Sequence, residues 1–134
     1  MVSRILNAST IVALFVGLQS GSVAYAQSVS KTVAAGGLLK LGHYASVNAD
    51  CSLLGMPVVR LSAAPTHGVV RTVKTSAFSH FTGAPFDQCN SRRVPGVSVE
   101  YRPERGFAGT DSFSVDIIYA SGRERVESFA VTVK

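Results

Sequence analysis

The stretch from residue 97 to residue 113, VSVEYRPERGFAGTDSF, constrains the fold more than any other part of the chain. Apolar and polar residues alternate on both sides of a turn that contains proline and glycine. Because successive side chains of a β-strand point to opposite faces, this pattern predicts two half-buried strands joined by the turn. In the first strand, Val97, Val99 and Tyr101 form the predicted inward face, and Ser98, Glu100 and Arg102 form the outward face.

The alternation continues on both sides of this stretch. Residues 111–119 place Phe113, Val115, Ile117 and Tyr119 on one face, and residues 123–134 form a last strand after a tight turn at 120–122. Upstream strands are predicted at 28–34, 38–45, 57–63 and 69–73, with a bulge at Gly42. Pro65 and Gly68 predict that the last two of these strands form a β-hairpin. The ten-residue spacing and the lack of a capped apolar helix predict an all-β, Ig-like antiparallel sandwich of about seven strands.

Irregular segments separate some of these strands. Residues 47–56 and most of 75–93 read as loops, and Val94-Pro95-Gly96 is predicted to be a turn. Each loop carries one cysteine, Cys51 and Cys89. An even cysteine count in an exported chain favours a disulfide, which stabilises a loop of this length by about 3.5–4 kcal/mol.

The N-terminus predicts export. Residues 1–26 have a basic residue, an apolar run of about eight residues and an Ala24-Tyr25-Ala26 cleavage site, the layout of a signal peptide. The apolar run is far shorter than the ~20 residues of a transmembrane helix. We therefore expect one domain at residues 27–134, periplasmic or secreted, with no transmembrane segment after signal cleavage.

The motif in residues 99–113 resembles a recurring bacterial Ig-like, cadherin-like repeat with the signature Y-x-P followed by G-F-x-G-x-D-x-F. The matching residues are Tyr101, Pro103, Gly106, Phe107, Gly109, Asp111 and Phe113. The upstream P-x-x-G-x-V segment at residues 65–70 and the terminal V-T-V are also similar. Such repeats stand in tandem and generally lack a disulfide, so adhesive function does not carry over to this single copy.

The motif residues themselves favour a structural role. Gly106 and Gly109 allow tight bends, and Phe107 and Phe113 supply apolar area to a core. Asp111, between a turn and a strand, is expected to accept hydrogen bonds from backbone N–H groups. Calcium binding at Asp111 is the alternative, although calcium needs six or more oxygen ligands and acidic neighbours are few.

Signs of catalysis or metal binding are weak. His43, His67 and His80 lie on separate segments without metal-ligand spacing, and no G-x-S-x-G elbow is present. Glu100 and Asp116 lie on outward strand faces, where an enzymatic carboxylate pair is the alternative to ordinary surface ion pairs. We expect no enzymatic activity and no cofactor; an envelope enzyme or a metal-binding periplasmic protein is the competing hypothesis.

The basic residues and aromatics of the last half suggest a binding role. The chain has a net charge of +5, and removal of Arg4 with the signal peptide leaves +4. If the turns flanking residues 97–102 lie close together, an anion-binding rim is formed by Arg92, Arg93, Arg102, Arg105, Arg123 and Arg125. Three aromatics of the irregular loop, Phe78, Phe81 and Phe86, either pack as a second core under the disulfide or contact a partner.

These observations lead to one expectation about function. The chain is predicted to be an exported, non-catalytic module with a binding or structural role in the cell envelope. The partner is an envelope protein or an anionic polysaccharide or cell-wall polymer, to which a basic exported protein is attracted. Nucleic acid is not expected, because no nucleic-acid-binding motif is present.

Overall fold

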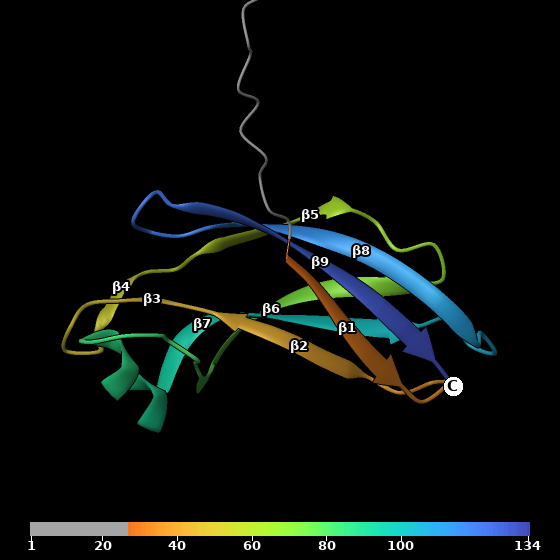
Figure 1. Cartoon of the computed structure of the whole chain (residues 1–134), viewed down its shortest axis with the longest axis horizontal. Coiled ribbons are helices and arrows are strands. Elements are labelled where there is room, and N and C mark those ends of the chain that lie inside the picture. The colour runs from red at the N-terminus through yellow and green to blue at the C-terminus, as the bar shows by residue number, and fades with distance from the viewer. Residues whose placement is uncertain (1–26) are drawn as a thin grey trace, which may run out of the picture.

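A computed structural model describes residues 27–134, which fold into a β-sandwich (Figure 1). The predicted signal peptide, residues 1–26, lies outside the described residues. The strands are β1 (Gln27–Val33), β2 (Leu39–Tyr44), β3 (Ser46–Val47), β4 (Leu53–Gly55), β5 (Val58–Ala63), β6 (Gly68–Phe78), β7 (Arg93–Pro103), β8 (Gly109–Ile118) and β9 (Glu124–Val133). One 3₁₀-helix, η1 (Phe86–Ser91), precedes β7. No helix within residues 27–134 is long and apolar enough to cross a membrane.

The seven longer strands form the two sheets of the sandwich, as predicted. One sheet has the order β1-β9-β8-β5 and the other β2-β7-β6, while β3 and β4 form a small separate ribbon. Sequence neighbours such as β5 and β6 lie in different sheets, which gives the immunoglobulin-type arrangement of crossed-over strands. The pairing is antiparallel except that β1 runs parallel to β9. Alternation shows which face of a strand is buried but not the direction of its neighbour, so this exception could not be predicted.

The core lies between the two sheets and uses the predicted inward faces. Val99 and Tyr101 of β7 meet Phe113, Val115 and Ile117 of β8, and all five are almost completely buried. From β9, the core receives Phe129, Val131 and Val133. Phe113 stacks between the rings of Tyr101 and Phe129, with centroids 5.7 and 5.0 Å away. The predicted bulge in β2 is also present, between Lys40 and His43.

The predicted hairpin of residues 57–63 and 69–73 is wrong. β5 pairs with β8 and β6 pairs with β7, so the Pro65–Gly68 connection crosses from one sheet to the other. A Pro and Gly turn signal fixes a local change of direction, and the same signal serves a hairpin or a crossing. β6 also continues to Phe78, five residues beyond its predicted end.

The predicted turn at Val94-Pro95-Gly96 is wrong as well, because β7 runs straight through it. β2 pairs with β7 only from Val97 onward, so Pro95 has a single neighbouring strand, where its missing N–H is tolerated. Gly96 is required for a different reason than a turn. A Cβ at Gly96 would collide with the Tyr44 carbonyl oxygen and lie 2.8 Å from the His43 ring.

Candidate binding site at the disulfide-bonded end

The sandwich has two ends of different character (Figure 1). The connections 45–57, 79–92 and 119–123 lie together at one end, which we call the loop end. The connections 34–38, 64–67 and 104–108 and the C-terminus lie at the opposite end, which we call the motif end. In immunoglobulin variable domains, loops gathered at one end of such a sandwich carry the binding site.

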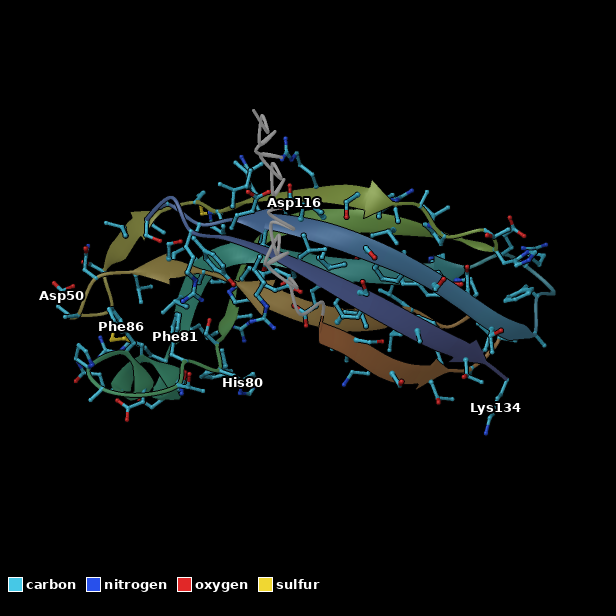
Figure 2. All side chains as sticks on the ribbon, turned by 45° about the horizontal axis from the view of Figure 1, so that its top comes forward. Asp50, His80, Phe81, Phe86, Asp116 and Lys134 are labelled. Atoms are coloured by element: carbon cyan, nitrogen blue, oxygen red, sulfur yellow. A yellow bond between two sulfur atoms is a disulfide. The ribbon has the colours of Figure 1, made fainter. Side chains whose placement is uncertain are left out.

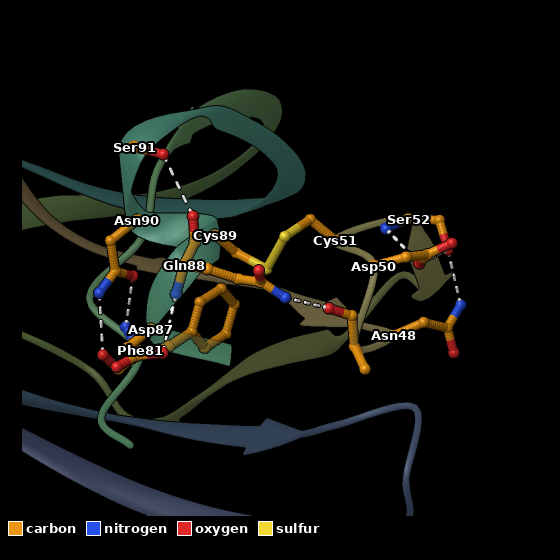
Figure 3. The surroundings of a disulfide bond; sticks show 11 residues. Asn48, Asp50, Cys51, Ser52, Phe81, Asp87, Gln88, Cys89, Asn90 and Ser91 are labelled. Atoms are coloured by element: carbon orange, nitrogen blue, oxygen red, sulfur yellow. Dashed lines mark hydrogen bonds between the residues drawn. A yellow bond between two sulfur atoms is a disulfide. The ribbon is translucent and has the colours of Figure 1, made fainter. Parts of the chain in front are cut away.

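A disulfide ties two of the three loop-end connections together (Figure 3). Cys51 of segment 45–57 is bonded to Cys89 of η1 across 38 positions of the sequence, as predicted. Around the disulfide, Ala45, Val47 and Val94 are buried with both cysteines, and Phe81 packs against them. This second core lies outside the space between the sheets and fixes the irregular segments.

Hydrogen bonds add further links at the loop end. The Gln88 side chain donates to the Ala49 carbonyl (2.6 Å), which joins η1 to the Cys51 segment (Figure 3). The Asn90 side-chain amide exchanges two hydrogen bonds with the backbone of Phe81. The third connection is attached too, because Ala120 N–H donates to Ser46 Oγ at 3.1 Å. The three connections therefore form one continuous surface.

Large apolar side chains remain exposed on or beside this surface. Leu53 and Leu54 of β4 are 43% and 50% exposed, Phe78 at the end of β6 is 53% exposed, and Phe86 at the start of η1 is 39% exposed. Figure 2 shows Phe86, Phe81, Asp50 and His80 at the loop end, far from Lys134. The sequence left two alternatives for the three aromatics, and they differ in outcome: Phe81 packs in the second core, whereas Phe78 and Phe86 remain partly exposed.

The six candidate arginines fall into two groups. β7 is one strand that carries Arg93 at its start and Arg102 near its end, about 30 Å apart at the usual rise per residue. Arg92, Arg93, Arg123 and Arg125 consequently belong to the loop end, and Arg102 and Arg105 to the motif end. No single rim contains all six. A role of either group in binding stays a prediction.

Some loop-end arginines also have structural contacts. Arg93 donates to the Ser76 carbonyl, and its guanidinium lies 5.7 Å from the centre of the Phe78 ring. Arg123 lies over Tyr119 at 5.4 Å, and Arg125 is 3.6 Å from the Glu127 carboxylate. Arg92 is exposed beside Asp50, whose pKa is lowered mainly by hydrogen bonds from Ser52 and slightly by the Arg92 charge.

At the motif end, Asp111 has the predicted role of hydrogen-bond acceptor. One carboxylate oxygen accepts the N–H groups of Thr66 and Ser112, and the other accepts His67 N–H and the Tyr101 hydroxyl, at 2.8 to 2.9 Å. Burial acts to raise the pKa of Asp111, but these hydrogen bonds outweigh it and hold the pKa below its usual value of 3.8. Four donors occupy both oxygens, which speaks against the calcium alternative.

The remaining motif residues shape the same end. Pro103 is buried, and Phe107 stacks on His67 with ring centroids 4.3 Å apart. Gly106 and Gly109 have φ angles of +79° and +140°, which side chains disfavour. The motif end therefore directs its polar and aromatic groups toward one another.

The two carboxylates of the enzyme hypothesis are not neighbours. Glu100 lies on the outer face of β2-β7-β6, whereas Asp116 lies on the outer face of the opposite sheet. Asp116 accepts a hydrogen bond from Arg60 at 2.6 Å, which is the main reason its pKa is lowered. The sequence reasoning missed Glu124, whose pKa is raised by its hydrogen bond with Asp116 and by the charge of that group. Cross-strand diagonal positions would have been the signal.

The three histidines also stay apart. His43 contacts Ser98 Oγ and the Val94 carbonyl through its two ring nitrogens. Ser98 is therefore engaged in a hydrogen bond, and it is half-buried. His67 stacks on Phe107 at the motif end, and His80 is exposed at the loop end. In the part of the chain that the structure describes, no three metal-ligating side chains converge.

Comparison with known proteins adds no family to this picture. The chain matches no family model and no curated protein.

Proposed function

We propose that the chain is an exported, non-catalytic Ig-like module that binds a partner in the cell envelope through its loop end. The observation that carries this proposal is the exposed group of Leu53, Leu54, Phe78 and Phe86 around a disulfide-anchored second core. Large apolar residues gathered on one surface mark interaction sites more often than scattered ones do.

The construction of the loop end supports binding because it reduces the entropy lost on association. The disulfide and the hydrogen bonds of Gln88 and Asn90 hold the connections in place before a partner arrives. Pre-ordered loops bind more tightly than loops that must be ordered on binding. The disulfide also fits the periplasmic or secreted location, since such bonds persist in oxidising compartments.

The chemistry of the loop end favours an envelope protein over an anionic polymer as the partner. Phenylalanine and arginine are enriched at protein interfaces, and the buried centre of an interface is more apolar than the rest of the surface. Arg92 and Arg123 would lie at the rim of such an interface, where charges steer association. An anionic polysaccharide or cell-wall polymer would instead depend on the arginines alone.

A binding assay with matched variants tests the proposal. The labelled protein is titrated with detergent-solubilised envelope protein and, separately, with purified cell-wall polymer. Leu54→Asp with Phe86→Asp should abolish binding to envelope protein and leave the unfolding midpoint nearly unchanged, because both residues are exposed. The control Ala35→Asp with Ala108→Asp places the same two negative charges at exposed positions of the motif end and should bind as the unchanged protein does. Equal binding by all three proteins would refute the loop-end site.

The exported state has a separate test. Mass spectrometry of the protein purified from the envelope should find Gln27 at the N-terminus. The mass should be two hydrogens below that of the reduced chain, because Cys51 and Cys89 are bonded. A retained residue 1–26 segment would contradict the expected signal cleavage.

The Ig-like, cadherin-like resemblance is consistent with this proposal. The motif from Tyr101 to Phe113 joins the two sheets through the Asp111 hydrogen bonds, which is a structural task. The loop-end disulfide is the departure from the repeat pattern, and it lies where we place the binding site.

A further inference from the structure

β6 is a sheet edge without a neighbour. It pairs with β7 on one side, and within residues 27–134 no strand pairs with its other side. It is also one of the two longest strands, with 11 residues. All residues from Arg71 to Ser76 are exposed, although Thr72 and Lys74 stand opposite the buried Val99 and Val97 of β7. The facing sheet therefore leaves even the inward-pointing side chains of this part of β6 uncovered.

The other three outer edges of the two sheets are less available. β2 has six residues and is interrupted by a bulge between Lys40 and His43. β1 is parallel to β9 and has seven residues, and β5 has six residues, one of which, Arg60, is engaged with Asp116. An open strand edge offers a row of unpaired N–H and C=O groups, to which an extended segment can add. β6 is thus the best site for strand addition.

The charge on β6 selects the kind of segment. The strand reads GVVRTVKTSAF, with Arg71 and Lys74 and no acidic residue. Neither cation has an ion-pair partner among the described residues. Two copies paired through β6 would bring these cations together, so self-pairing is disfavoured. An acidic segment would instead place its carboxylates next to these two cations, which attracts it to the edge.

A hollow beside the edge adds a second positive surface. It has a volume of about 360 Å³ and is lined by Leu38, Val69, Arg71, Glu100 and Arg102. Glu100 stands in register between Arg71 of β6 and Lys40 of β2, and Arg102 lines the same hollow. This face therefore carries three cations and one carboxylate. Val69, 55% exposed, gives the hollow an apolar wall.

We infer that β6 binds an acidic, extended peptide segment that adds as a further strand to the β2-β7-β6 sheet. This goes beyond the proposed function, because the surface is separate from the loop end. Val69, Arg71 and Val73 share the outer face, and Lys74 lies on the inner face. An antiparallel partner therefore matches with an acid opposite Lys74, an apolar residue opposite Val73, an acid opposite Arg71 and an apolar residue opposite Val69.

A peptide of that pattern, Thr-Glu-Val-Thr-Glu-Thr-Val-Thr, is the probe. Its fluorescence anisotropy is measured on titration with the protein. Lys74→Glu should weaken binding about tenfold, since an attraction becomes a repulsion. A peptide with lysine in place of the first glutamate should restore binding to that variant. The control Lys31→Glu makes the same charge change on the edge strand β1 and should leave the affinity unchanged.

A second probe separates strand pairing from charge attraction. Two versions of the acidic peptide, each N-methylated on one set of alternate residues, keep both charges, but one of them lacks the N–H groups that face β6. That version should lose binding, whereas equal binding of both would refute strand addition and leave a simple charge site. Polygalacturonate is then added at the same concentration of carboxylate charge as the peptide. Complete displacement of the peptide would assign the surface to a polysaccharide instead. The inference would also be overturned if the peptide did not bind. It would be overturned too if the unchanged protein formed a dimer and Lys74→Glu dissociated it.

Discussion

The two ends of the sandwich are organised in opposite ways. At the motif end, the carboxylate of Asp111 holds the 64–67 connection and the Tyr101 hydroxyl, and the aromatic rings of His67 and Phe107 cover each other. At the loop end, a disulfide and a second core hold the connections in place, while leucines and phenylalanines point outward. At the motif end, polar groups form hydrogen bonds with one another. At the loop end, large apolar side chains remain exposed to solvent.

This difference is the reason that we assign a stabilising role to the motif end and propose a binding role for the loop end. A connection held by buried hydrogen bonds uses its functional groups to keep its own shape. A connection held by a covalent bond leaves its side chains available to a partner. The motif is therefore informative about the fold, and the disulfide lies at the end of the sandwich where we propose that a partner binds.

Removal of the disulfide should produce the largest effect. Cys51→Ser with Cys89→Ser frees a loop that spans 38 positions, which lowers the free energy of unfolding by about 4 kcal/mol on the chain-entropy estimate. Urea unfolding measures the change. Hydrogen exchange should show the amides of 45–57 and 79–92 opening more than those of 64–67. If both ends open equally, the disulfide does not fix the loop end locally.

Removal of the Asp111 carboxylate should affect the other end and come second. Asp111→Ala leaves Tyr101 Oη–H and the Thr66 and His67 N–H groups without their acceptor, at a cost of about 3 kcal/mol. Urea unfolding gives the loss of stability. Partner binding at the loop end should persist in the folded fraction, and its loss would show that the two ends are coupled.

Most of the fold could be predicted because its cause is local. Alternation marked the strands and their buried faces, and the inward rows of β7, β8 and β9 lie where they were expected. Pairing could not be predicted in the same way. The sequence around Pro65 and Gly68 contains a turn signal but no signal for the strand that β6 meets, which depends on contacts with β7 distant in sequence.

The candidate site was predictable in part. The cysteine count and the predicted signal peptide were sufficient to predict the disulfide, and the irregular composition of 75–93 indicated a special loop. The distribution of the arginines was not accessible, since it depends on β7 running unbroken past Pro95. The open edge of β6 was missed for a related reason: exposure of Thr72 and Lys74 follows from what the other sheet fails to cover.

Substitution of two glycines at the motif end should lower stability by smaller amounts. A Cβ at Gly68 would collide with the buried Tyr101 ring, so Gly68→Ala should cost about 2 kcal/mol through overpacking. A Cβ at Gly106 would meet no atom within 4 Å, and its φ of +79° alone costs about 1 kcal/mol in Gly106→Ala. Thermal unfolding of both variants compares them. The reverse order would mean that turn geometry, not the Tyr101 contact, limits this end.

Acidification should have the smallest effect on stability near neutral pH, and it should act on the motif end through Asp111. The pKa of Asp111 lies below its usual value in the folded protein, so its ionised form contributes stability above pH 4 that is lost as pH falls through the folded pKa. Asp111→Asn keeps a side chain of similar shape but removes this titration. Urea midpoints measured from pH 7 to pH 2.5 should therefore fall less steeply below pH 4 for the variant. Asp50 and Asp116, whose pKa values are also lowered, supply the slope that remains. Identical slopes for both proteins would mean that the hydrogen bonds to Asp111 do not depend on its charge, and the motif end would then owe its order to packing.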